Sequence, residues 1–178
     1  MKSLKALALR RDERGAAIIE LALVAPIFAL MTIGIVDMSN AFSRKLALEQ
    51  AAQRAIEKVM QTTQLDTVEG TLKTEACDQV DGVNADGTCK NTPITTDNVT
   101  VTFRQECTDA SGNLTTNTAT DATTFDSFSC AAGTTKEAKY ISVTVTDKYT
   151  PMFPIHFSDY SSSDGAYDLS ATAGVRTK

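Results

Sequence analysis

Four cysteines are the residues in this chain best able to do covalent chemistry: Cys77, Cys89, Cys107 and Cys130. An even number of cysteines in a region rich in Thr, Asn and Asp predicts two disulfides, formed in an oxidising compartment. Four cysteines permit three pairings. We favour the local pairing, Cys77 with Cys89 and Cys107 with Cys130, because each pair flanks one turn-rich loop. A bridge closing a loop of this size stabilises the fold by about 3 kcal/mol in the entropic description.

Metal binding is the other chemistry open to these cysteines. The chain has no Cys-x-x-Cys and a single histidine, His156, which is far from them in sequence, so disulfides are favoured over zinc. The segment DGVNADG carries Asp81, Asn84 and Asp86, but it lacks the spacing and the closing glutamate of a calcium loop, so a plain turn is favoured. Nucleophile, zinc-protease and phosphate-loop motifs are absent. The sequence therefore predicts no metal, no cofactor and no enzymatic activity.

One carboxylate, Glu20, interrupts the apolar run from Ala16 to Val36 and stands five residues after Gly15. A helix over this run would be about 31 Å long, the thickness of a bilayer core. Five basic residues precede it, namely Lys2, Lys5, Arg10, Arg11 and Arg14. The positive-inside rule then places the N-terminus in the cytoplasm and the rest of the chain outside. An acid inside a membrane is costly, but Glu20 lies only about one turn from the cytoplasmic edge, so a functional acid and a tolerated interfacial glutamate both stay open from this residue alone.

Composition limits the remaining choices. The net charge is −5, and no basic patch lies beyond the N-terminus, which argues against nucleic-acid binding. Tryptophan is absent and aromatic residues are sparse, so a large core is not expected.

We predict a basic cytoplasmic leader (1–15), a transmembrane helix (16–38), an amphipathic continuation of that helix (39–61), and a periplasmic, disulfide-bonded, β-rich head (62–178).

The amphipathic part has apolar residues recurring at spacings of three and four, which form one face of a helix: Leu48, Ala52, Ala55, Ile56, Val59 and Met60. Three later segments alternate in polarity and predict strands, at 98–103, 139–149 and 167–176. Residues 62–97 are polar and turn-rich, 108–124 are expected to be a long, weakly structured loop, and 151–157 a loop or an edge segment. One long helix packed on a small antiparallel sheet gives an α+β fold.

The pattern resembles the type IV pilin-like proteins, in which a basic leader and a glycine precede a glutamate and a long apolar helix. RGAAIIELALVAPIF (14–28), followed by GIVDMSNAFSRKLALEQAAQRA (34–55), is similar to the TadE-like pseudopilins of the tight-adherence (Tad/Flp) pilus. The strong resemblance covers residues 14–56, and the closing strands support it weakly. Leu21 stands where major Flp pilins usually carry Tyr, and those pilins are much shorter, so a minor pilin is favoured over the main filament subunit.

The resemblance implies a structural role. A prepilin peptidase would cut after Gly15, so that Ala16 becomes the mature N-terminus and its amine pairs with Glu20 of a neighbouring subunit. Pro26 would kink or loosen the helix, either to let it bend within a filament or as in an ordinary kinked membrane helix. The implied partners are that peptidase, other pilins through helix bundling, and the bacterial inner membrane. The implied role is pilus initiation, assembly or tip formation.

Two other functions stay open at this stage. An uncleaved, membrane-anchored periplasmic binding module or adhesin would share the topology but would not be cut at Gly15. A secreted protein cut by signal peptidase after Ala41 would begin near Phe42. The apolar run is longer than a signal-peptide core and contains Glu20, which argues against secretion. The position of the mature N-terminus distinguishes the three.

Overall fold

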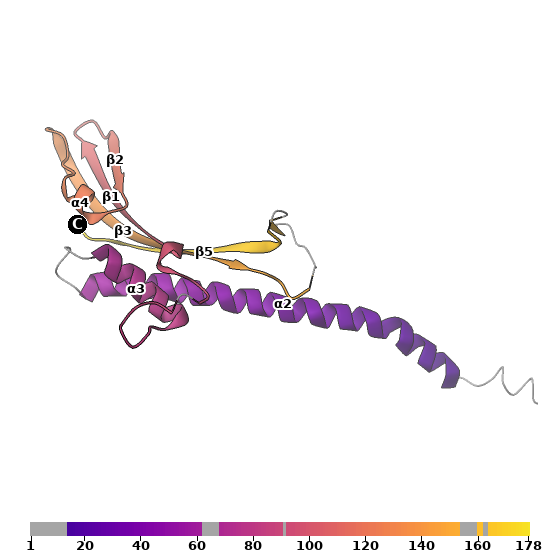
Figure 1. Ribbon diagram of the computed structural model, residues 1–178. Helices are drawn as coiled ribbons and strands as arrows, with labels where there is room; N and C mark the ends of the chain where they lie inside the picture. Colours follow the sequence, from indigo (N-terminus) through magenta and orange to yellow (C-terminus); the bar gives the residue numbers. More distant parts are fainter. Residues whose placement is uncertain (1–13, 62–67, 91, 154–159, 162–163) are drawn as a thin grey trace, which may run out of the picture. The chain divides into compact units, whose positions relative to one another are not determined.

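The computed structural model describes residues 14–61, 68–90, 92–153, 160–161 and 164–178. The helices are α2 (Arg14–Gln61), α3 (Val68–Asp81) and α4 (Ala122–Asp126), with a short 3-10 helix η1 (Thr96–Asn98). The strands are β1 (Val99–Asp109), β2 (Leu114–Ala119), β3 (Thr134–Tyr149), β4 (Tyr160–Ser161) and β5 (Ala166–Arg176), as Figure 1 shows. The predicted α+β class, a long N-terminal helix followed by an antiparallel sheet, is confirmed.

The chain divides into two compact units. The first, called here the stem unit, comprises Met1–Asn40 and Pro151–Ile155. The second, the head unit, comprises Ala41–Thr150 and His156–Lys178. Helix α2 is continuous through the boundary and belongs to both. The leader residues 1–13 and His156 lie outside the described residues, so the predictions made for them are not tested.

The head unit is built on a five-stranded antiparallel sheet with the order β2-β1-β3-β5-β4. The two long strands β1 and β3 pair at its centre, where Val101 faces Val143 and Phe103 faces Ile141. Alternate residues of these strands are buried, as the period of two predicts. The three predicted strands correspond to β1, β3 and β5, and are confirmed.

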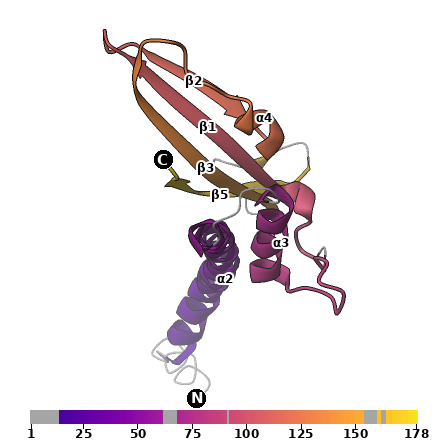
Figure 2. The same cartoon turned by 90° about the vertical axis from the view of Figure 1, so that its left-hand side faces the viewer.

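Helices cover one face of this sheet. Figure 2 shows α2 and α3 next to each other on the same side of the sheet. From Leu48 to Val59 the inward side of α2 joins strand residues such as Phe103 and Ile141 in one hydrophobic core. Three alanines on that side, Ala51, Ala52 and Ala55, are at most 1% exposed.

An ion pair joins the two layers of the head. Arg44 of α2 places its Nε 3.0 Å from a carboxylate oxygen of Asp147 on β3. The Asp147 side chain is only 7% exposed, so its charge needs a nearby cation. Further along, Arg54 of α2 reaches Glu75 of α3, with 2.9 Å between Nε and the carboxylate. The first pair joins α2 to the sheet, and the second joins α2 to α3.

Three expectations about the head were wrong in detail. Met60 is 64% exposed and does not belong to the buried face of α2, whereas Ala51, which was not expected there, is fully buried. Residues 68–81 of the turn-rich region form α3. Residues 114–119, expected in a loop, form β2, which pairs with β1.

Candidate membrane-spanning and assembly segment

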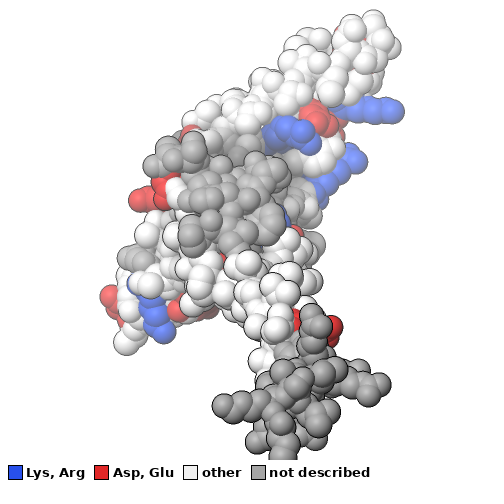
Figure 3. Space-filling view, turned by 90° about the vertical axis from the view of Figure 1, so that its right-hand side faces the viewer, with Lys and Arg blue, Asp and Glu red and all other residues white. Residues whose placement is uncertain are grey.

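The N-terminal half of α2 is apolar on all sides and exposed on all sides. Most large apolar side chains between Ile18 and Val36 keep between 42% and 69% of their surface exposed: Ile18, Ile19, Leu21, Leu23, Val24, Ile27, Phe28, Leu30, Met31, Ile35 and Val36. Within the described residues, α2 is the helix long and apolar enough to cross a membrane. A helix that is hydrophobic all round needs an apolar environment on every side. Figure 3 shows a nearly uncharged surface where this helix emerges from the grey N-terminal residues.

The predicted processing residues lie in the first turn of this helix. Arg14, Gly15 and Ala16 are already helical. Glu20 follows in the next turns with an exposed side chain. No ion pair to Glu20 is found among the residues that the structure describes. The arrangement leaves its carboxylate directed outward, where a group from another molecule can reach it.

Pro26 lies inside the helix, which continues through it. Proline has no N–H, so the carbonyl one turn earlier loses its helical partner. Figure 1 shows the indigo part of α2 bending while it stays helical. A local weakness at this place follows from the covalent structure of proline alone.

Asp37, at the far end of the apolar run, makes a contact that the sequence analysis missed. Its carboxylate accepts hydrogen bonds from the backbone N–H groups of Met152 (2.9 Å) and Phe153 (3.1 Å). The side chain of Asp37 is 8% exposed. The partners are more than a hundred residues away in sequence, so no local pattern could have revealed them. The two prolines of PMFP, which leave only two N–H groups in four residues, are a signal visible in retrospect.

The cysteines are paired locally, Cys77 with Cys89 and Cys107 with Cys130, the pairing favoured from the sequence. The Cα atoms of the two pairs lie 5.8 Å and 5.7 Å apart. The first bridge ties the end of α3 to the loop before η1, and the second ties β1 to the segment before β3. Both stabilise the head by restricting the freedom of its unfolded chain.

Asp81 approaches the first disulfide, and together Cys77, Asp81 and Cys89 have the composition of a metal site. Both sulfurs are bonded to each other, so neither is a thiolate able to bind a metal. Asp81 instead accepts a hydrogen bond from the backbone N–H of Ile94 (3.1 Å). Burial raises the pKa of its carboxyl above the ordinary value, and the Ile94 N–H opposes that rise. We therefore interpret this cluster as a structural element and not as a metal site.

The neighbouring loop is a turn. Asp86 accepts hydrogen bonds from Thr88, and Asn84 exchanges backbone bonds with the same turn. Gly87 has a φ of 80°, the left-handed conformation that an Asp-Gly turn requires. The side chains of Asn84 and Asp86 thus bind within the loop, as the plain-turn interpretation expects.

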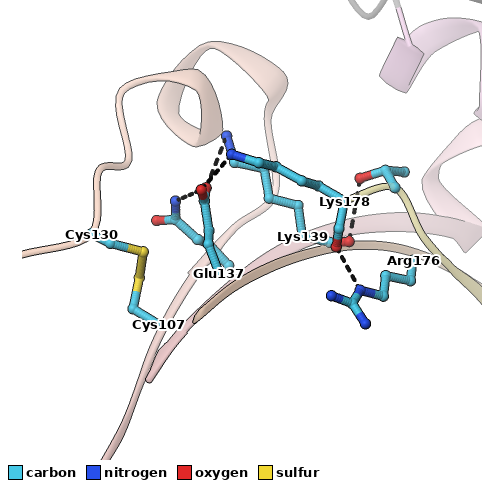
Figure 4. A network of polar contacts seen from close by, with 8 residues as sticks. Cys107, Cys130, Glu137, Lys139, Arg176 and Lys178 are labelled. Carbon is cyan, nitrogen blue, oxygen red and sulfur yellow. Dashed lines mark hydrogen bonds and ion pairs between the residues drawn. A yellow bond between two sulfur atoms is a disulfide. The ribbon is translucent and has the colours of Figure 1, made fainter. Parts of the chain in front are cut away.

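A polar network fixes the C-terminal end of the sheet. Figure 4 shows Lys178 and Lys139 directed toward Glu137, with the Cys107–Cys130 bridge beside them. Glu137 also accepts a hydrogen bond from the buried amide of Gln105 (2.9 Å). The hydrogen bond from Lys178, followed by that from Gln105, lowers the pKa of Glu137 below its ordinary value of 4.5. The network therefore has a structural role: it joins the C-terminal residue to strands β1 and β3 at this end of the sheet.

Two of the comparisons with known proteins returned nothing: neither a curated protein nor a solved structure matches this chain. A scan of family models gives one match, to the family described as TadE-like protein, over residues 15–56. That segment begins at Gly15, contains Glu20 and Pro26, and runs through the apolar half of α2 into its buried half. The match confirms the resemblance drawn from the sequence: residues 15–56 are similar to the TadE-like family.

Proposed function

We propose that the protein is a minor pilin or pseudopilin of a Tad-type pilus, processed by a prepilin peptidase after Gly15 and acting in pilus initiation, assembly or tip formation. The observation that supports this most strongly is the single helix α2, whose apolar, exposed half continues without a break into the core of the head. Such a helix can lie in a membrane and later among the helices of a filament while the head stays folded. Its role is structural, and the protein is a substrate of the peptidase, not an enzyme.

Glu20 has a defined part in this proposal. Cleavage after Gly15 creates an α-amino group on Ala16. In a bundle of apolar helices that cation requires a carboxylate, and the outward-facing Glu20 of an adjacent subunit supplies one. Removing one partner of a buried charge pair costs about 3–5 kcal/mol, enough to prevent assembly.

The position of the mature N-terminus tests the proposal. We would purify the membrane protein from cells with and without the prepilin peptidase and determine its N-terminus by mass spectrometry. A chain that starts at Ala16 only when the peptidase is present supports processing. A chain that starts at Met1 in both strains overturns it and leaves an uncleaved, membrane-anchored binding module or adhesin. A start near Phe42 overturns both and makes the protein secreted.

Two matched pairs of variants sharpen this test. Gly15→Val should abolish cleavage, whereas Gly34→Val should not, because a side chain at Gly34 meets no atom within 4 Å. Glu20→Gln should leave cleavage intact but reduce cross-linking to other pilins at least tenfold, as expected when about 1.4 kcal/mol or more is lost. Glu57→Gln, an exposed carboxylate in the head part of α2, serves as the control and should change neither. Equal cross-linking by the Glu20 variant and the wild type would argue against the amine partner.

A further inference from the structure

We propose that Pro151–Phe153, called here the Pro151–Phe153 loop, is a second membrane contact. Met152 and Phe153 lie in the interfacial region of the bilayer that α2 crosses, and Asp37 holds the loop against the end of the membrane-spanning part. The proposal rests on α2 spanning a membrane, as argued under Proposed function. It adds a lipid-binding surface from the C-terminal part of the chain.

The position of the loop follows from Asp37. This residue comes directly after the apolar run Ala16–Val36, which matches the thickness of the hydrocarbon core. The end of that run lies at the membrane interface, and the hydrogen bonds of 2.9 Å and 3.1 Å bring Met152 and Phe153 to the same level. Hydrogen bonds to an ionised carboxylate are stronger than neutral ones, so the contact can fix a loop that is remote in sequence.

The backbone of the loop suits an apolar environment. An unpaired N–H group near lipid costs several kcal/mol, so a non-helical segment tolerates the interface only when its donors are satisfied. Pro151 has no N–H, and neither does Pro154, the next residue in the sequence. The two N–H groups between them are those of Met152 and Phe153, and Asp37 accepts both. The run PMFP therefore presents no free backbone donor.

The side chains of the loop are apolar and uncovered. Met152 is 70% exposed and Phe153 39% exposed. On α2, the residues around Asp37 are exposed in the same way: Ile35 at 66%, Val36 at 47% and Met38 at 50%. Exposed apolar surface that continues a membrane-spanning surface is a membrane contact rather than a water-facing one. An aqueous turn, in contrast, would carry polar side chains.

The absence of tryptophan from the chain permits a direct test. Phe153→Trp introduces a single tryptophan, whose emission can be excited selectively, into the full-length protein. The variant is reconstituted at high lipid excess into phosphatidylcholine vesicles with brominated or ordinary acyl chains. Bromine quenches tryptophan only on close contact. We expect brominated lipid to reduce the emission about twofold, because interfacial groups enter the acyl boundary. Phe28→Trp, in the middle of the apolar run, should be quenched more strongly, and Leu114→Trp, exposed in the head, should not be quenched.

Each outcome has a separate meaning. Quenching of the residue 28 and 153 fluorophores, with none at residue 114, supports the inference. Quenching at residue 28 but not at residue 153 overturns it while the membrane span stands. A lack of quenching at residue 28 overturns the span and the inference with it.

A second variant tests the role of Asp37. Asp37→Ala in the Phe153→Trp background removes both acceptors, and the quenching should fall to the level of the residue 114 fluorophore. Asp126→Ala, an exposed carboxylate in α4, is the matched control and should leave the quenching unchanged. Undiminished quenching in the Asp37 variant would overturn the holding role. The near-ultraviolet circular dichroism of every variant, compared with the wild type, establishes that the head is folded.

Discussion

The two halves of α2 form one helix but lie in opposite environments: the first is exposed, and the second is buried along one side. In the stem unit, all large apolar side chains from Ile18 to Val36 except Ile33 are 42–69% exposed, whereas in the head unit Leu48, Ile56 and Val59 are at most 7% exposed. The first half is apolar around its whole circumference and needs an apolar solvent or other helices. The second half is apolar along one stripe, and the same chain supplies the sheet that covers it. The difference shows that the distribution of apolar residues around a helix, rather than their number, decides what must cover it.

Truncation of a buried side chain should give the largest difference between the two halves of α2. Leu48→Ala removes a fully buried side chain and should lower the free energy of unfolding of the head by about 2–5 kcal/mol. Leu23→Ala, 68% exposed in the stem, and Leu46→Ala, 54% exposed in the head part of α2, should change it little. Urea unfolding of the detergent-solubilised protein, followed by near-ultraviolet circular dichroism, measures all three. Similar losses in the three variants would contradict the division of the helix into two environments.

An arginine introduced into α2 should disturb the N-terminal half much more than the exposed side of the head part. Leu23→Arg places a cation in the middle of the apolar run, at a cost of about 2.5–3.5 kcal/mol on insertion scales. We expect a large fraction of this variant to be released from membranes by alkaline carbonate. Leu46→Arg lies on the exposed side of the head part and should stay in the membrane fraction like the wild type. If both variants were retained equally, the N-terminal half of α2 would not be the membrane anchor.

The ion pair between α2 and β3 should contribute to the head alone. Arg44→Ala leaves Asp147 buried without its cation and should destabilise the head by about 1–3 kcal/mol, while membrane retention is unchanged. Glu49→Ala is the control, since the Lys45–Glu49 pair is exposed and its charged atoms are 3.9 Å apart. The same urea titration measures both variants. An Arg44 variant as stable as the Glu49 variant would mean that Asp147 is satisfied by other groups.

The smallest effect should be a dependence on pH that is confined to the head. The hydrogen bonds from Lys178 and Gln105 lower the pKa of Glu137 in the folded state, so its carboxylate stabilises the fold above the ordinary pKa of 4.5. That contribution disappears as the pH falls through the lowered pKa. Glu137→Gln should therefore have a lower Tm than the wild type at pH 7, and the difference should shrink below pH 4. A difference that does not change with pH would show that the titration of Glu137 is not responsible.

Elements supported by a repeating local pattern were predicted correctly. The alternation of Val99, Val101 and Phe103, and of Ile141, Val143 and Val145, identified β1 and β3, because one face of each strand is buried. Helix α3 was missed because its buried residues are few, although Leu72, Ala76 and Val80 recur every fourth residue and could have revealed it. Strand β2 was missed because it is a polar edge strand with only Ala119 buried. Its strand conformation comes from hydrogen bonds to β1 and not from its own composition.

The sequence by itself determined the features that depend on covalent structure and on local periodicity. These are the long helix, its apolar first half, the central strands, the disulfide framework and the Gly15–Glu20 spacing that matches the TadE-like segment. Only the tertiary structure decided the contacts between residues distant in the chain: Asp37 with Met152 and Phe153, Arg44 with Asp147, and Glu137 with Gln105 and Lys178. A polar side chain has the same local appearance whether it faces solvent or a buried partner. Its partner is chosen by the folding of the whole chain, which brings together groups that no sequence window contains.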